Sequence, residues 1–122
     1  MSGTYSDLEV WQAAMELVVG IYRLTRLFAK EEMYGLASQM RRAAVSVPSN
    51  ITEGKGRSSD KELIQFLRHA RGLLFEVQTQ VTLAERLGYG AKADCDSMNR
   101  KVVRIGQMLN GLIRSVRPRS AV

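Results

Sequence analysis

Residues 39–54 read QMRRAAVSVPSNITEG, and two stripes of side chains run through this segment. The apolar stripe consists of Met40, Ala44, Val47 and Ile51. The polar stripe consists of Gln39, Arg42, Ser46, either Ser49 or Asn50, and Glu53. Both recur at steps of three and four residues, which predicts that they are two faces of one α-helix. A polar stripe in this position is a solvated face, an inter-helix hydrogen-bond network or a binding surface.

Apolar residues recur at helical spacing in three further segments, so the sequence predicts four helices over about residues 7–28, 32–54, 59–87 and 92–116. Ser59, followed three residues later by Glu62, forms a capping box at the start of the third helix. Pro48 interrupts the second helix, and we expect a kink there rather than a helix end. The connections are short and no segment alternates as a strand does. The fold class predicted is therefore all-α, an antiparallel up-down-up-down four-helix bundle in one domain over residues 1–122.

The ends and packing of two helices can be predicted in more detail. The second helix is expected to begin near Glu31 or Glu32, because acidic residues suit a helix start. In the fourth helix, Gly106 and Gly111 weaken the helix and therefore indicate close packing against a neighbour. A basic tail is expected over residues 117–122. The fourth helix is expected to bury a heptad seam made of Met98, Val102, Ile105, Leu109, Leu112 and Val116.

The net charge of +6 is concentrated near the C-terminus. Residues 1–90 carry eleven Lys or Arg and ten Asp or Glu, whereas residues 91–122 carry seven and two. A local excess of cations favours a polyanionic partner such as nucleic acid, although a solvated helix face has the same composition. Lys55 and Arg57 precede a helix N-terminus and add a possible phosphate contact. The predicted nucleic-acid-binding residues are Arg100, Lys101, Arg104, Arg114, Arg117, Lys55 and Arg57.

Cysteine content and hydropathy indicate the cellular compartment in which the protein is expected. Cys95 is the only cysteine, so the chain forms no internal disulfide and no zinc cluster of several cysteines. The first residues lack the pattern of a signal peptide, and no apolar run is long enough to span a membrane. We therefore expect a cytoplasmic protein.

Catalytic patterns are missing from the sequence. A di-iron bundle needs paired Glu-x-x-His motifs, and His69 has no Glu three residues before it. Glu53 and Glu76 are the carboxylates expected to be partly buried, but Arg42 and Arg71 lie on the same helices as ion-pair partners. We therefore predict a structural network rather than an active site, with no metal and no cofactor. Its members are Gln39, Arg42, Ser46, Asn50, Glu53, Arg71 and Glu76.

The first helix has an apolar face wider than one partner helix needs. Its second row, Leu8, Trp11, Met15, Val18 and Tyr22, either completes a large monomer core or forms a subunit interface. Aromatic and Met residues are enriched at interface cores, so we predict an oligomer interface at Trp11, Met15, Val18 and Tyr22.

Two segments carry a family resemblance: residues 39–54, and residues 66–90, which read FLRHARGLLFEVQTQVTLAERLGYG. With them the chain resembles the four-helix-bundle proteins encoded by intervening sequences in bacterial 23S ribosomal RNA genes. The accessory variability protein of diversity-generating retroelements is a relative. The resemblance implies a ring-like homopentamer and no catalytic residues. For the retroelement relative it implies binding to nucleic acid and to a reverse transcriptase.

Two hypotheses about function follow. The first is a non-enzymatic, oligomeric bundle that binds nucleic acid through a basic surface on the fourth helix, where the cations turn away from the seam. The alternative is a protein-interaction scaffold without nucleic-acid affinity. Binding to phosphates would fall steeply with salt, whereas docking on an apolar face would not.

Overall fold

The computed structural model describes residues 8–120, with side chains described for residues 8–116. Four α-helices make up this part of the chain: α1 (Glu9–Thr25), α2 (Leu36–Lys55), α3 (Asp60–Arg86) and α4 (Lys92–Ser120). A short 3₁₀ turn, η2 (Lys30–Glu32), lies between α1 and α2. No strand occurs within residues 8–120. The all-α fold class is confirmed.

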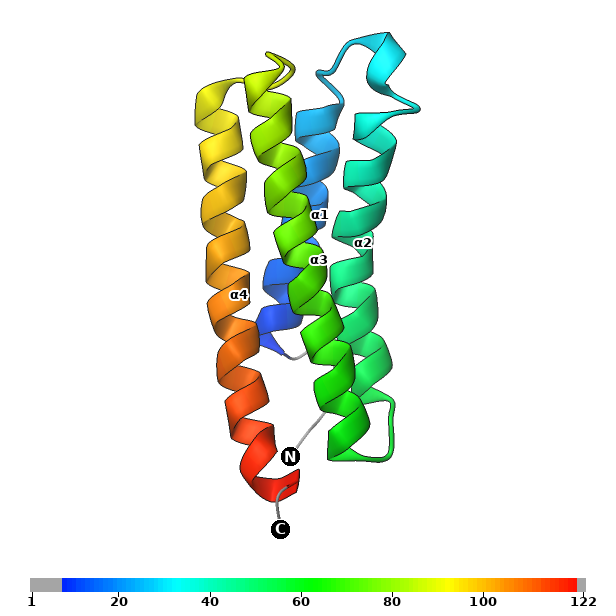
Figure 1. Cartoon of the computed structure of the whole chain (residues 1–122), viewed down its shortest axis with the longest axis vertical. Helices are drawn as coiled ribbons and strands as arrows, with labels where there is room; N and C mark the ends of the chain where they lie inside the picture. The colour runs from blue at the N-terminus through cyan, green and yellow to red at the C-terminus, as the bar shows by residue number, and fades with distance from the viewer. Residues whose placement is uncertain (1–7, 121–122) are drawn as a thin grey trace.

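The helices form a square in cross-section. Each helix packs against its neighbours in sequence, and α4 also packs against α1, whereas the diagonal pairs do not meet within residues 8–120. Successive helices run in opposite directions in Figure 1, with the α3–α4 pair toward the viewer's left and α2 toward the right. The α1–α2 side of the bundle is therefore opposite the α3–α4 side.

Two helix ends differ from the prediction. Glu31 and Glu32 lie in η2, and α2 begins only at Leu36, after Gly35 in the N-cap position. At the other end of the chain, α4 continues to Ser120, so the helix passes Pro118 and includes part of the predicted tail. Helix α2 runs without interruption through Pro48, which rejects a helix end at that residue.

The start of α3 has the predicted capping box. Ser59 is the N-cap, and its hydroxyl oxygen accepts a hydrogen bond from the backbone N–H of Glu62 at 3.2 Å. The Glu62 carboxylate lies 3.3 Å from the same hydroxyl. At the end of α3, Gly88 has a φ of 78°, a conformation that side-chain-bearing residues rarely adopt, and it turns the chain toward α4.

The core lies between the four helices and contains the apolar stripe of residues 39–54. Met40, Ala44, Val47 and Ile51 are all fully buried, which confirms that stripe. On α4 the seam differs by one residue, because Ile113 is buried and Leu112 is only half-buried. The other large side chains that are fully buried are Leu17, Ile21, Leu67, Leu74, Val77, Val81, Ile105, Leu109 and Val116.

Helices α2 and α3 approach closely at Gly54. A Cβ atom at this position would lie 2.9 Å from Cβ of Phe66 and 3.0 Å from Cδ1 of Leu63, so only glycine fits. The two glycines of α4 behave differently. A Cβ on Gly106 would meet nothing within 4 Å, and one on Gly111 only the Arg114 guanidinium at 3.9 Å. Close packing within the chain is therefore the wrong explanation for Gly106 and Gly111.

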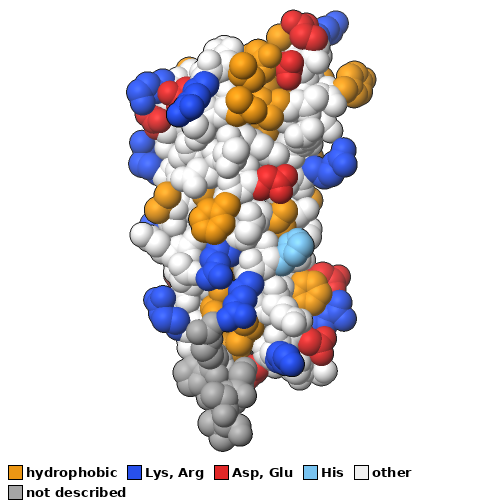
Figure 2. All heavy atoms as spheres, in the orientation of Figure 1, with side chains coloured by type: hydrophobic (Ala, Val, Ile, Leu, Met, Phe, Trp, Pro, Cys, Tyr) orange, Lys and Arg blue, Asp and Glu red, His pale blue; other side chains and the backbone are white. Residues whose placement is uncertain are grey.

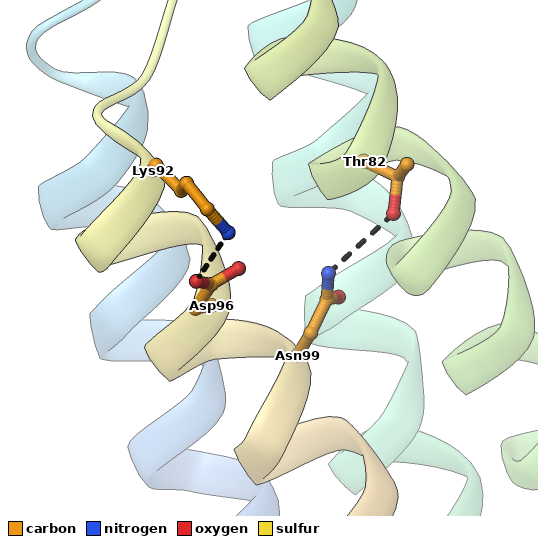
Figure 3. Close-up of polar contacts among 4 residues, drawn as sticks. All are labelled: Thr82, Lys92, Asp96 and Asn99. Atoms are coloured by element: carbon orange, nitrogen blue, oxygen red, sulfur yellow. Dashed lines mark hydrogen bonds and ion pairs between the residues drawn. The ribbon is translucent and has the colours of Figure 1, made fainter.

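Two side-chain hydrogen bonds join α3 to α4. Arg71 Nη1 donates to Asn110 Oδ1 at 2.8 Å, and Asn99 Nδ2 donates to Thr82 Oγ1 at 3.4 Å (Figure 3). Both bonds join residues of the same antiparallel register, since Thr82 follows Arg71 by as many residues as Asn110 follows Asn99. This register places Arg68 and Arg71 of α3 at the same level as Arg114 of α4.

Candidate nucleic-acid interface

The polar stripe of α2 faces outward and bonds within its own helix. Gln39, Arg42 and Glu53 are exposed, while Ser46 and Asn50 are half-buried. The Ser46 hydroxyl donates to the carbonyl of Arg42 at 3.0 Å, and Asn50 Nδ2 donates to the carbonyl of Ser46 at 2.7 Å. Short polar side chains on a helix surface often form such hydrogen bonds with backbone carbonyls one turn earlier in the same helix.

The two carboxylates expected to be partly buried are exposed. Glu53 pairs at 3.0 Å with Arg57, which lies two residues after the end of α2, and not with Arg42. Glu76 accepts a hydrogen bond from Gln80 Nε2 at 3.4 Å, while Arg71 bonds across to Asn110 instead. In the single chain, the described hydrogen bonds of these residues run within one helix, to Arg57, or from Arg71 to Asn110, and they do not join the predicted members to one another between helices.

Three of the predicted α4 cations form an outward stripe. Arg100, Arg104 and Arg114 are exposed on the side of α4 opposite the buried seam, and we call these three residues the α4 stripe. No Asp or Glu follows Asp96 in the remaining residues of the chain. The ion pairs among residues 8–116 are Arg57–Glu53 and Lys92–Asp96, so no carboxylate neutralises the α4 stripe by direct pairing. Its charge is available to an external anion.

Lys101 is placed differently from its neighbours. It is half-buried and lines a groove between α1 and α4, together with Glu9, Glu16 and Arg104. Acidic and basic side chains share this groove in equal number, which weakens its attraction for a polyanion. Arg117 lies in the last turns of α4, and its side chain is outside the described residues.

The two cations at the end of α2 are not equivalent. The guanidinium of Arg57 pairs with Glu53 and lies 4.9 Å from the centre of the Phe66 ring, so its charge is partly neutralised and its position is fixed. Lys55 is half-buried and takes part in none of the described ion pairs. Lys55 is the last residue of α2, and the C-terminal ends of α2 and α4 lie at the same end of the bundle in Figure 1.

Sequence reasoning missed the contribution of α3 to the cationic surface. Arg71 is held at the α3–α4 junction by its bond to Asn110, and Arg68 is exposed one turn earlier on α3. Arg114 follows Asn110 by one turn of α4, so these three arginines lie at the same end of the junction. Figure 2 shows Lys and Arg side chains on the α4 side and over its junction with α3. The three-residue spacing of Arg68 and Arg71, which puts both on one face of a helix, could have predicted this contribution from the sequence.

The wide apolar face of α1 is divided between core and surface. Trp11 is half-buried, and its indole Nε1 donates to Thr52 Oγ1 of α2 at 3.1 Å. Val18 is half-buried and packs against the core. Met15 and Tyr22 keep 39% and 40% of their surface exposed. Of the predicted interface residues, Trp11 and Val18 therefore serve the monomer, and Met15 and Tyr22 remain accessible.

Three residues near the α3–α4 turn have raised pKa values. The hydrogen bond to Glu32 raises the pKa of Tyr89, and the hydrogen bond to Asp96 raises the pKa of Lys92. Burial raises the pKa of the Cys95 thiol. Each of these effects favours the protonated form and suits a structural role better than a nucleophile or base.

The part of the chain that the structure describes offers neither a cluster of metal ligands nor a helix suited to span a membrane. No group of three or more His, Cys, Asp or Glu side chains converges there to hold a metal ion. Across the same residues, no helix combines the length and apolar character needed to cross a bilayer.

Comparison with known proteins places this bundle in a family. A solved structure from Bacteroides thetaiotaomicron, described as a protein of unknown function from the S23 ribosomal protein family, has a TM-score of 0.79 and 23% sequence identity. The match covers 85% of this chain and 97% of that chain, and it shows a shared fold. A search of curated proteins gives no match. The model of the 23S rRNA-intervening sequence proteins matches residues 6–111, and the chain belongs to this family.

Proposed function

We propose that this protein is a non-enzymatic, oligomeric bundle that binds the backbone of nucleic acid through the α4 stripe. One observation carries the proposal. The stripe of Arg100, Arg104 and Arg114 is exposed, no acidic residue follows Asp96, and no described ion pair neutralises the stripe. Guanidinium groups bind phosphate with paired, charge-assisted hydrogen bonds, which suits arginine to this role.

The dimensions of the stripe fit a backbone contact. Arg100 and Arg114 are fourteen residues apart, which is about 21 Å along a helix at 1.5 Å per residue. Arg68 and Arg71 of α3 widen the surface on one side of the α4 stripe. Three arginines along an exposed helix face offer contacts to phosphates rather than to base edges, so binding should depend on phosphates and have little sequence specificity.

Binding to structured RNA and to duplex DNA over a salt series tests the proposal. We expect affinity to fall steeply with salt, with a slope that decreases by about 0.9 for each lost phosphate contact on duplex DNA. Replacing Arg100, Arg104 and Arg114 by Glu should abolish binding. A matched variant with Arg26, Lys61 and Arg86 replaced by Glu has the same net charge and changes three exposed cations outside the stripe. Equal loss in both variants would mean that net charge, and not the stripe, determines binding.

The proposal includes assembly into a homo-oligomer. Met15 and Val19 of α1 are 39% and 47% exposed, and Leu27, just after α1, is 71% exposed; the three line a groove of about 620 Å³ between α1 and α4. Exposed apolar side chains arranged together favour a protein partner, and we propose a second copy of this chain. The family resemblance gives the expectation of five copies. Sedimentation or light scattering of Val19→Lys should show a smaller species than the unmodified chain.

A protein-interaction scaffold is the second candidate function, and the groove lined by Met15, Val19 and Leu27 favours it. In that case a different protein covers Met15, Val19 and Leu27, and a reverse transcriptase is one candidate from the resemblance. Capture of such a partner should be insensitive to salt and lost in Val19→Lys, while charge reversal of the α4 stripe should leave it intact. Absence of nucleic-acid binding even at low salt would favour this candidate.

A further inference from the structure

A second cationic surface lies on the opposite side of the bundle, where the polar stripe of α2 meets α1 and η2. A pocket of about 810 Å³ opens there, within the size range of small-molecule sites. Three cations and two aromatic residues line it, with smaller polar and apolar side chains between them. These five residues are Lys30, Arg41, Arg42, Tyr22 and Tyr34, and no acidic side chain lines the pocket.

Arg41 is held in position before any ligand arrives. Its Nε donates to Thr25 Oγ1 at 2.8 Å, and the Thr25 hydroxyl donates in turn to the carbonyl of Ile21 at 2.7 Å. Its guanidinium lies 4.7 Å from the centre of the Tyr22 ring. These contacts use Nε and one face, so the two terminal nitrogens have no protein partner in the described structure. A preorganised guanidinium with free N–H groups is suited to bind an anion with little loss of entropy.

The neighbouring charges reinforce this preference. Arg42 and Lys30 are exposed and belong to none of the described ion pairs. The acids of η2 do not line the pocket, and the Glu32 carboxylate instead accepts a hydrogen bond from Tyr89 at 3.2 Å. Three cations around one cavity without a carboxylate raise the local potential and favour a ligand with more than one negative charge.

The aromatic side chains indicate that the ligand is also flat. Tyr34 is 96% exposed and Tyr22 is 40% exposed, and the apolar side chains of Met33 and Val45 lie beside them. A tyrosine so exposed contributes almost nothing to the monomer core. Aromatic rings beside arginines are the combination that holds an unpaired nucleobase together with its phosphate.

We propose that this pocket binds a nucleoside phosphate, with the phosphate on Arg41, Arg42 and Lys30 and the base against Tyr34 and Tyr22. The nucleotide is either free or part of an unpaired strand, since both present the same base and phosphate. The inference does not depend on the proposed function, because the pocket lies on the α1–α2 side and the α4 stripe on the side of α4. It assigns a role to Arg42 and Ser46 of the polar stripe, which line the pocket.

Calorimetric titration of the full chain with adenosine 5′-monophosphate tests the proposal, with adenosine and inorganic phosphate as partial ligands. We expect the monophosphate to bind at least about tenfold more tightly than either part, because stacking and phosphate contacts add. Tyr34→Ala and Arg41→Gln should each weaken binding by about tenfold. The matched controls Phe75→Ala and Arg86→Gln remove an exposed aromatic residue and an exposed arginine elsewhere, and they should bind as the unmodified chain does.

A single-stranded oligonucleotide distinguishes the two sources of the nucleotide. If only the oligonucleotide binds, and Tyr34→Ala weakens it, the pocket takes a nucleotide within a strand. Binding of neither probe overturns the inference, as does unchanged binding in both Tyr34→Ala and Arg41→Gln. Because Tyr34 is almost fully exposed, its variant should keep the fold even if Arg41→Gln does not. Oligonucleotide binding that is lost only on charge reversal of the α4 stripe refutes the pocket and retains the proposed function.

Discussion

Replacing Gly54 by Ala should destabilise the bundle, whereas the same substitution at Gly72 should stabilise it. A Cβ on Gly54 would lie 2.9 Å from Cβ of Phe66, an atom fixed to the α3 backbone. A Cβ on Gly72, which is exposed within α3, would meet nothing within 4 Å. The two variants therefore add the same methyl group to a helix in opposite environments.

The magnitudes follow from two opposing effects. Alanine is favoured over glycine in a helix by up to about 1 kcal/mol. Overpacking of a contact that cannot yield costs about 1–3 kcal/mol, since α3 itself must move away from α2. We expect the free energy of unfolding to fall by about 1–2 kcal/mol in Gly54→Ala. In Gly72→Ala we expect it to rise by about 0.5–1 kcal/mol.

Urea unfolding followed by circular dichroism measures both changes at one protein concentration, which an oligomer requires. The two transition midpoints should lie on opposite sides of that of the unmodified chain. A Gly54→Ala protein as stable as the unmodified chain would refute the close approach of α2 and α3. A destabilised Gly72→Ala protein would show that something packs on the outer face of α3.

Three further predictions concern single interactions. Ser59→Ala removes the N-cap of α3 and should cost about 1 kcal/mol, seen as a lower melting temperature; an unchanged value would contradict the cap. The hydrogen bond from Tyr89 to Glu32 raises the pKa of Tyr89. The bond therefore stabilises the folded protein fully below the ordinary pKa of tyrosine, about 10, and this stabilisation is lost as pH rises through the raised pKa. The urea midpoint should therefore fall more steeply in that alkaline range for the unmodified chain than for Tyr89→Phe. Burial and a raised thiol pKa should make Cys95 react with a disulfide reagent far more slowly in the folded protein than in denaturant, and equal rates would place the thiol at the surface.

Local sequence rules predicted the parts of the fold that depend on a few consecutive residues. The capping box at Ser59 is an example, because one hydroxyl and one backbone N–H three residues later define it. The apolar stripe from Met40 to Ile51 is another, since helical spacing alone determines which side chains share a face. The exchange of Leu112 for Ile113 in the core shows the limit of a strict heptad, because a straight helix drifts from a 3.5-residue period.

The surroundings of the candidate site residues could not be predicted from residue spacing, because they depend on contacts between helices. Arg71 was assigned to an ion pair, but the α3–α4 register brings it to Asn110, where it is half-buried at the junction of the two helices. Arg41 belongs to neither stripe of residues 39–54 and was not predicted as a site residue, yet Thr25 and Tyr22 from another helix hold it at the edge of a pocket. In both cases the decisive partner comes from a different helix.

The two hydrogen bonds between α3 and α4 also limit how these helices can change in length. Thr82 follows Arg71 by eleven residues and Asn110 follows Asn99 by eleven, which is about three helical turns, so both bonds lie on one side of the pair. Deletion of one residue from α3 between Arg71 and Thr82 rotates one of these two side chains by about 100° around the helix axis, away from its hydrogen-bond partner on α4. Paired insertions of whole turns in both helices keep both bonds in place. Length variation among bundles of this kind should therefore occur in matched steps, or in the connections between helices.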